Sequence, residues 1–128
     1  MNDIEDIGSI RLLVDKFYAS VRQDVLIGPI FNKAIGDNWA PHLEKMYAFW
    51  NAVLFAEPGF TGNPFAKHAP LPIDAEHFSR WLTLFRQTLD ECFEGPVATE
   101  AKNRAELMAI LFQNKLERMH NDPGKFIA

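Results

Sequence analysis

The chain has 128 residues, 48% of them hydrophobic, with a formal net charge of −4 and a pI near 5.5. This length and hydrophobic fraction suffice for one domain with a buried core, and they exclude a disordered chain. The acidic balance offers no basic surface for phosphate backbones or anionic lipid, so we expect no nucleic-acid or membrane partner. Residues 1–6 are acidic where a signal peptide is basic, and no long uncharged apolar run occurs, so we expect a cytoplasmic protein.

Cysteine and aromatic content narrow the class further. The single cysteine, Cys92, excludes an intrachain disulfide, a zinc finger, a cysteine-ligated iron–sulfur cluster and covalent c-type haem attachment. Its acidic neighbour Glu91 favours an inert thiol that serves only in packing. The 11 Phe, 3 Trp and 2 Tyr are more ring surface than a chain this short usually needs, so we expect a flat group packed among them.

The first predicted helix runs from Ser9 to about Val25, with Ser9 as its N-cap, and Gly28-Pro29 ends it. A short apolar turn follows over residues 30–35 and ends at Gly36. The buried stripe of the helix has the spacing of one helical face and consists of Ile10, Leu13, Val14, Phe17, Tyr18 and Val21.

The second long helix is predicted to begin after Asp37 or Asn38 and to reach about Phe55. Its buried stripe is Trp39, Leu43, Met46, Phe49 or Trp50, and Val53. Glycine and proline then interrupt the periodicity from Glu57 to Pro72, which indicates a long loop. Asn63-Pro64 supplies an N-cap and an N1 proline, so a short helix is expected there, ending near His68.

Two further helices complete the chain. Asp74 is the predicted N-cap of a helix of about twenty residues, and Gly95-Pro96 breaks it. A last helix extends to about Met119, and residues 121–128 read as a tail. Because no strand pattern, repeat or linker occurs, the sequence predicts an all-α fold in a single domain over residues 1–128, with its core at about 9–119.

The histidines are the most informative polar residues. His68 ends the predicted short helix, where its Nδ1–H can donate to a carbonyl and leave Nε2 as a metal ligand; simple capping of the helix is an equally good reading. His77 reads as a histidine at the core edge, and His42 shares the inward face of Met46, where packing is the commoner role. His120 is given no role. Serine-hydrolase, P-loop and dinucleotide-binding motifs do not occur.

Six motifs stand in a fixed order along the chain. Together they resemble the group III truncated haemoglobins from about Ile10 to Leu116. The motifs are Phe17-Tyr18, Gly28-Pro29-Ile30-Phe31-Asn32, Trp39-x-x-His42-Leu43-x-x-Met46-x-x-Phe49-Trp50, Gly62-Asn63-Pro64-x-x-Lys67-His68, His77-Phe78-x-Arg80-Trp81-Leu82-x-Leu84-Phe85, and Phe112-Gln113-Asn114-Lys115-Leu116.

The resemblance implies a two-over-two helical sandwich that holds protohaem, haem b, without a covalent bond. It places His68 as the proximal iron ligand. It makes Tyr18 and Trp81 distal hydrogen-bond donors and His42 a residue at the distal gate, with binding of the iron by His42 as the alternative. Met46 is expected at the apolar position of the haem pocket next to the bound ligand. Residues expected to line the macrocycle or its rim are Phe31, Phe49, Trp50, His77 and Phe78, and those expected to pair with the propionates are Lys67 and Arg80.

The resemblance also implies binding of O₂, NO or CO. Two donors aimed at a charge that develops on bound O₂ favour chemistry over storage. The expected reactions are oxidation of nitric oxide to nitrate, as in a nitric oxide dioxygenase, or peroxidase-like oxidation, either with an external reductase. The alternatives are a sensor or oxygen carrier without turnover, and a helical adaptor that keeps the fold without haem.

Overall fold

The computed structural model describes residues 1–60 and 73–121, with side chains described as far as residue 118. These residues form α-helices and contain no strand, which confirms the all-α prediction. The predicted short helix from Asn63 to His68 and the tail beyond residue 121 lie outside the described residues. The helices are α1 (Ile7–Gln23), α2 (Gly28–Ile35), α3 (Trp39–Phe55), α5 (Ala75–Cys92) and α6 (Pro96–Asn121).

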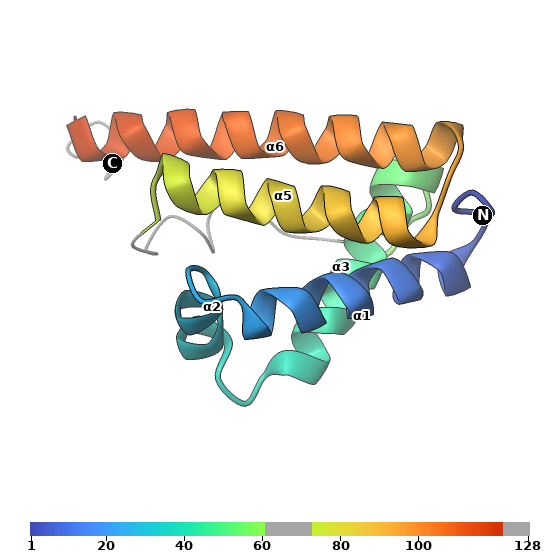
Figure 1. Ribbon diagram of the computed structural model, residues 1–128, viewed down its shortest axis with the longest axis horizontal. Helices are drawn as coiled ribbons and strands as arrows, with labels where there is room; N and C mark the ends of the chain where they lie inside the picture. The colour runs from blue at the N-terminus through green and yellow to red at the C-terminus, as the bar shows by residue number, and fades with distance from the viewer. Residues whose placement is uncertain (61–72, 122–128) are drawn as a thin grey trace.

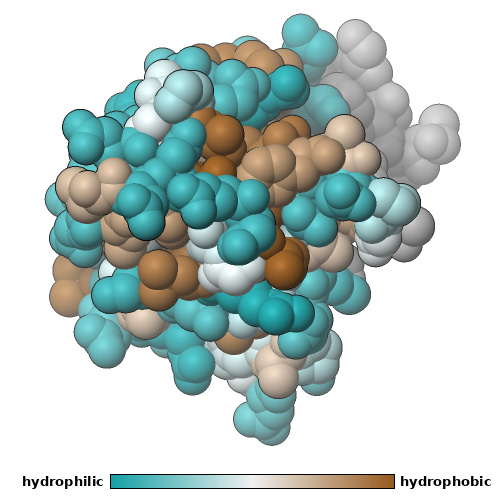
Figure 2. Space-filling view, turned by 90° about the vertical axis from the view of Figure 1, so that its right-hand side faces the viewer, coloured by the Kyte–Doolittle hydropathy of each residue, from teal (hydrophilic) through white to brown (hydrophobic). Residues whose placement is uncertain are grey.

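The long helices pack in pairs. Helices α5 and α6 run side by side, and α1 packs against both α3 and α5 (Figure 1). The short helix α2 packs against α1. The end of the molecule where α1 begins is covered mainly by hydrophilic residues, with apolar ones gathered near the centre of that face (Figure 2). No helix in the described part of the chain has the length and apolar character needed to cross a bilayer.

Local signals explain most helix ends. Asn38, one of the two predicted candidates, is the N-cap position of α3, but its side chain makes no capping hydrogen bond. Asp74 caps α5 by accepting from the backbone N–H of Glu76. The predicted cap of α1 was wrong: the carboxylate of Asp6 accepts from the N–H of Ser9, so Ser9 lies inside the first turn. An ionised carboxylate competes well for that position because the helix N-terminus carries partial positive charge. The predicted apolar turn before Gly36 is the helix α2.

Helix α6 begins at a junction with the start of the chain. The carboxylate of Asp3 accepts hydrogen bonds from the N–H groups of Val97 and Ala98, at 2.9 and 2.8 Å. Gly95 has φ +145°, and a Cβ placed there would lie 2.5 Å from the Asp3 carboxylate. Position 95 therefore needs glycine for both its backbone angle and the closeness of Asp3.

The core is built around Phe17 of α1. Its side chain is 1% exposed, and its ring lies edge-on to Trp81 and Phe85 of α5, with centroids 5.5 and 5.0 Å away. Trp50 of α3 stacks on the same Phe85 at 4.9 Å. Edge-to-face and stacked rings add to the energy of burial and favour definite orientations. This aromatic cluster of Phe17, Trp50, Trp81 and Phe85 joins α1, α3 and α5.

Candidate functional site

A cavity of about 490 Å³ lies next to the aromatic cluster, within the usual range for small-molecule sites. Its walls come from α1, α2, α3, α5 and α6, and most of them are apolar. The residues that line it are Tyr18, Ile27, Phe31, Ala34, Ile35, Asn38, Pro41, His42, Lys45, Met46, Phe49, Trp50, Phe60, Ile73, His77, Phe78, Trp81, Met108, Ala109 and Phe112.

Two side chains with hydrogen-bond donors reach this cavity from different helices. Tyr18 comes from α1 and is 7% exposed, and Trp81 comes from α5. Phe17 contacts both rings, at 5.0 Å from Tyr18 and 5.5 Å from Trp81. Burial raises the pKa of the Tyr18 hydroxyl above its usual value, so that group keeps its proton at neutral pH. Both groups can therefore donate a hydrogen bond into the cavity.

Tyr18 also packs against His42 and Trp39 of α3. The three rings lie edge to face, with Tyr18 5.1 Å from His42 and 5.8 Å from Trp39. The guanidinium of Arg22 lies 4.6 Å from the Trp39 ring centroid on the outer side, within the range of a cation–π contact. His42 therefore packs against Tyr18 and Trp39 and lines the cavity beside Tyr18. Its role as the distal gate stays a prediction.

The remaining apolar positions of the predicted pocket line the same cavity. Phe31 comes from α2, and Phe78 is buried on α5. Met46, Phe49 and Trp50 line the cavity from α3, and Phe49 lies edge-on to Phe60 at 5.1 Å.

His77 lies at the start of α5, where it takes part in the helix cap and also reaches the cavity. It lines the cavity, and its Nδ1 lies 3.0 Å from the carboxylate of Asp74 within the capping box of α5. A histidine at N3 therefore completes the helix cap and presents its ring to the cavity. The predicted role of His77 at the rim of a bound group stays a prediction.

Arg80 differs from its predicted place. It does not line the cavity, and its Nε donates to Oδ1 of Asp24 at 2.6 Å. The Asp24 side chain is only 2% exposed and also accepts from the N–H groups of Leu26 and Ile27, each at 3.0 Å. Burial raises the pKa of Asp24, but the bonds from Ile27, Arg80 and Leu26 outweigh this and hold it below its usual value. The buried carboxylate attracts Arg80 more strongly than a solvent-exposed rim would.

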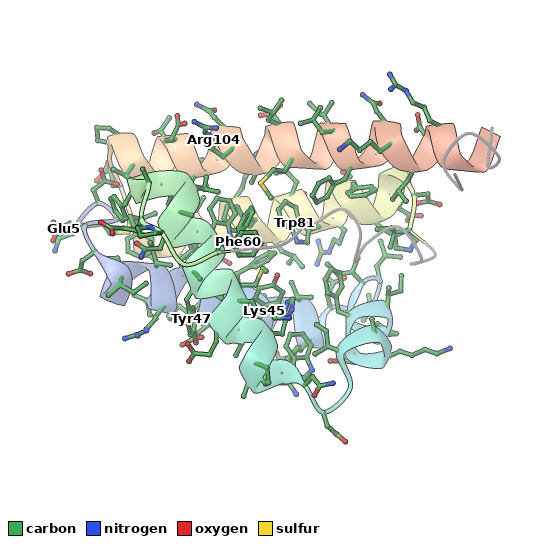
Figure 3. The ribbon with its side chains drawn as sticks, turned by 180° about the vertical axis from the view of Figure 1, so that it is seen from behind. Glu5, Lys45, Tyr47, Phe60, Trp81 and Arg104 are labelled. Carbon is green, nitrogen blue, oxygen red and sulfur yellow. The ribbon has the colours of Figure 1, made fainter. Side chains whose placement is uncertain are left out.

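Among the described residues, the cation that lines the cavity is Lys45 of α3, an exposed residue that the sequence analysis missed. Figure 3 shows Lys45 on α3, Phe60 after the end of that helix and Trp81 on α5. Lys45 follows His42 by three residues, so helical periodicity puts the two on one face, and this spacing was the available signal. Ile73, Met108 and Ala109 were also missed as cavity residues, because nothing local distinguishes them from core positions.

Two predicted residues, Lys67 and His68, lie outside the described residues, and their proposed roles stay predictions.

Comparisons with known proteins bear on what this cavity holds. The profile of the family described as "Bacterial-like globin" matches residues 4–119. The chain belongs to the bacterial-like globin family. This globin is 38% identical over 112 residues to the Group 3 truncated hemoglobin ctb of Campylobacter jejuni subsp. jejuni serotype O:2, covering 84% of this chain and 88% of that protein. The crystal structure of the group III truncated hemoglobin from Campylobacter jejuni superposes with a TM-score of 0.84 at 36% identity, covering 91% of this chain and 95% of the other.

These matches confirm the resemblance to group III truncated haemoglobins and the truncated globin fold. Membership of the globin family implies that the chain binds haem and small diatomic ligands. The described residues fit such a group, because the cavity has flat aromatic and aliphatic walls suited to a macrocycle. Lys45 supplies a cation at an exposed edge, where the carboxylates of a macrocycle would remain in contact with water.

Proposed function

We propose that this globin holds haem b without a covalent bond in the cavity, as one haem domain with His68 as the axial iron ligand. Bound there, haem supplies an iron centre that takes up diatomic ligands and exchanges electrons. The apolar wall formed by Phe31, Phe49 and Phe78 would exclude water from the macrocycle. Lys45 would pair with a propionate, and Lys67 stays a second candidate for that role.

The function that we propose is redox chemistry on a bound diatomic ligand, such as oxidation of nitric oxide to nitrate or peroxide-type oxidation. The observation that carries it is the convergence of Tyr18 and Trp81, from α1 and α5, on one cavity. Two donors held in a water-poor site stabilise the negative charge that O₂ acquires during oxidation of its partner, and they need little reorganisation to do so. Neither hydroxyl nor indole N–H is engaged by another hydrogen bond among the described residues.

An external reductase would be the partner. Oxidation of NO to nitrate releases about three electrons per molecule and full reduction of O₂ takes about four, so one electron per turnover would have to come from outside the chain. Steady consumption of NO with a reductase, O₂ and the purified globin would support the redox function. A sensor or carrier would bind the same ligands and show no catalytic turnover.

The proposal is tested by replacing each donor and timing ligand release. A hydrogen bond to a charged acceptor contributes about 1.5–3 kcal/mol, so Tyr18→Phe and Trp81→Phe should each speed O₂ release by roughly ten- to a hundredfold. CO carries less charge on its terminal oxygen, so its release should change little. Tyr47→Phe is the matched control, because Tyr47 bonds to Asp15 and is not among the residues lining the cavity. Equal acceleration of O₂ and CO would show that the two side chains act only through their shape.

The axial ligand has its own test. His68→Gly should lose haem or accept free imidazole as a replacement ligand, whereas His77→Ala should retain haem with the same ferrous absorption spectrum. Normal haem retention and an unchanged spectrum in His68→Gly would assign the iron bond to another residue.

His42 is proposed as a gate and not as a sixth iron ligand. Pro41 in the first turn of α3 limits the motion of this end of the helix, and the ring of His42 packs against Tyr18 and Trp39. The ferric protein should therefore be high-spin. A low-spin ferric spectrum that His42→Leu converts to high-spin would show that His42 binds the iron.

A further inference from the structure

The ion pair between Asp24 and Arg80 connects two helices that each carry a distal donor. Arg80 Nε lies 2.6 Å from Asp24 Oδ1, although the residues are 56 positions apart. The remaining Asp24 bonds, from Leu26 and Ile27, fix the same carboxylate to the turn that leads into α2. The carboxylate therefore has a defined place and direction, and Arg80 is bound to it through one of its donors.

The pair is close in sequence to both donors. Trp81 directly follows Arg80 on α5, and Tyr18 precedes Asp24 by six residues, or about 9 Å along α1. The described contacts between α1 and α5 also include the ring contact of Phe17 with Trp81 and Phe85, within an apolar core that both helices share. Apolar burial is non-directional, and edge-to-face ring contacts favour an orientation only weakly, so these contacts alone leave room for small rotations of one helix on the other. A charged hydrogen bond at a second point restricts such rotation, because its geometry is narrow.

We propose that Asp24 and Arg80 are positioning residues that fix α1 against α5, so that the Tyr18 hydroxyl and the Trp81 indole N–H point at one ligand atom. This inference rests on the proposed function of Tyr18 and Trp81 as donors, and it gives Arg80 a role in place of the predicted contact with a propionate. Retaining a nearly buried carboxylate is costly unless it is paired, and a positional requirement explains why the charge is kept.

The test compares variants of the pair in the haem-loaded protein. Arg80→Met removes the guanidinium and keeps most of the apolar stem, while Asp24→Asn removes the charge and retains the shape. Small misplacement of an aligned group is costly, so each variant should speed O₂ release about three- to tenfold and leave CO release unchanged. The stretching frequency of bound CO, which responds to nearby donors, should shift in both variants. The double variant should differ little from either single one, because both remove the same contact.

Arg86→Met is the matched control. Arg86 lies on the same helix α5 and pairs with Glu106 of α6 at 3.0 Å, and it is not among the residues lining the cavity. Its replacement should leave O₂ release, CO release and the CO stretching frequency unchanged. Arg80→Lys keeps a cation near Asp24 and should recover part of the wild-type O₂ rate; it also serves if Asp24→Asn fails to fold.

Tyr18→Phe, measured alongside, separates this inference from the proposed function. If Tyr18→Phe releases O₂ selectively faster but Arg80→Met behaves like Arg86→Met, the positioning role is overturned and the donor role stands. If Arg80→Met speeds O₂ and CO release equally, the pair only stabilises the fold and the inference is overturned. If Tyr18→Phe itself shows no selective effect, the proposed function fails, and the positioning role fails with it. In the Tyr18→Phe background, Arg80→Met should add a smaller factor than it does alone.

Discussion

Two carboxylates, Asp3 and Asp24, accept hydrogen bonds from pairs of backbone N–H groups, but they do so in different parts of the molecule. Asp3 serves the first turn of α6, and Asp24 serves the turn before α2. Asp24 also pairs with the guanidinium of Arg80, and its hydrogen-bond partner Ile27 lines the cavity. Neither Asp3 nor its partners Val97 and Ala98 line the cavity. One chemical device therefore holds the fold together at Asp3 and, as we propose, orients functional groups at Asp24. Variants at the two junctions should therefore differ in which property they change.

The largest loss of stability is expected from Gly95→Ala at the Asp3 junction. The added Cβ would meet the Asp3 carboxylate, and alanine is strained at φ +145°, so we expect a loss of about 3 kcal/mol in the free energy of unfolding. Urea unfolding measures this loss. The ratio of O₂ to CO release rates should stay at the wild-type value, and a changed ratio would remove the distinction between the two junctions.

A smaller loss is expected from Asp3→Ala, which removes the acceptor but introduces no clash. Loss of a helix cap costs about 1–2 kcal/mol. The helix content at low temperature should stay close to that of the wild type, because α6 is also held by its packing on α5. Circular dichroism and urea unfolding test both statements, and an unchanged unfolding midpoint would show that water replaces Asp3 without cost.

Acid should weaken both junctions. Burial raises the pKa of Asp3, but the bonds from Val97, Ala98 and Ile4 lower it by more, and the pKa of Asp24 is likewise held down. A carboxyl with a lowered folded-state pKa stabilises the protein above its unfolded value of about 3.9, and this contribution is lost as pH falls through the folded-state pKa. The urea concentration at the unfolding midpoint, measured from pH 7 to pH 3, should therefore decrease once the pH is below about 4. The decrease should be less steep in Asp24→Asn. An equal slope in wild type and variant would assign the acid sensitivity to other groups.

The smallest effect is expected from an ion pair at the surface, away from both Asp3 and Asp24. Lys102 pairs with Asp90, and both side chains are partly or largely exposed. Exposed pairs of this kind contribute about 0.2–1 kcal/mol, so Lys102→Met should change the unfolding free energy by about 0.5 kcal/mol or less, without effect on ligand release. A loss as large as that of Asp3→Ala would show that exposure is a poor guide to the strength of these ion pairs.

Much of the fold could be predicted because its signals are local. Periodicity located the long helices. From the few residues around them, Asp74 was recognised as a cap and Asn38 as one of two candidate cap positions. The cap of α1 was misplaced because Asp6 and Ser9 are both good cap residues, and only the structure decides between them. The Asp3 cap could not be predicted, because its partners are 94 and 95 positions away.

The cavity was predictable only in part. The described aromatic residues that the resemblance placed around the macrocycle or the ligand line it, since their order and spacing carry the signal. The pairing of Arg80 with Asp24 was missed because the sequence shows that Arg80 is a cation but does not show whether a propionate or the Asp24 carboxylate lies nearer to it. Lys45 was missed because an exposed lysine on a helix reads as an ordinary solvated residue.

The link between Asp3 and α6 also has a consequence for the order of folding. Asp3 leaves the ribosome well before Val97 and Ala98, which follow it by 94 and 95 positions. The cap on the first turn of α6 therefore depends on a contact between residues far apart in the sequence. Such contacts form late, because closing the long loop between them costs conformational entropy. Until that moment the nascent chain can pair α1 with α3, while the face of α5 that receives α6 stays exposed to solvent and to chaperones.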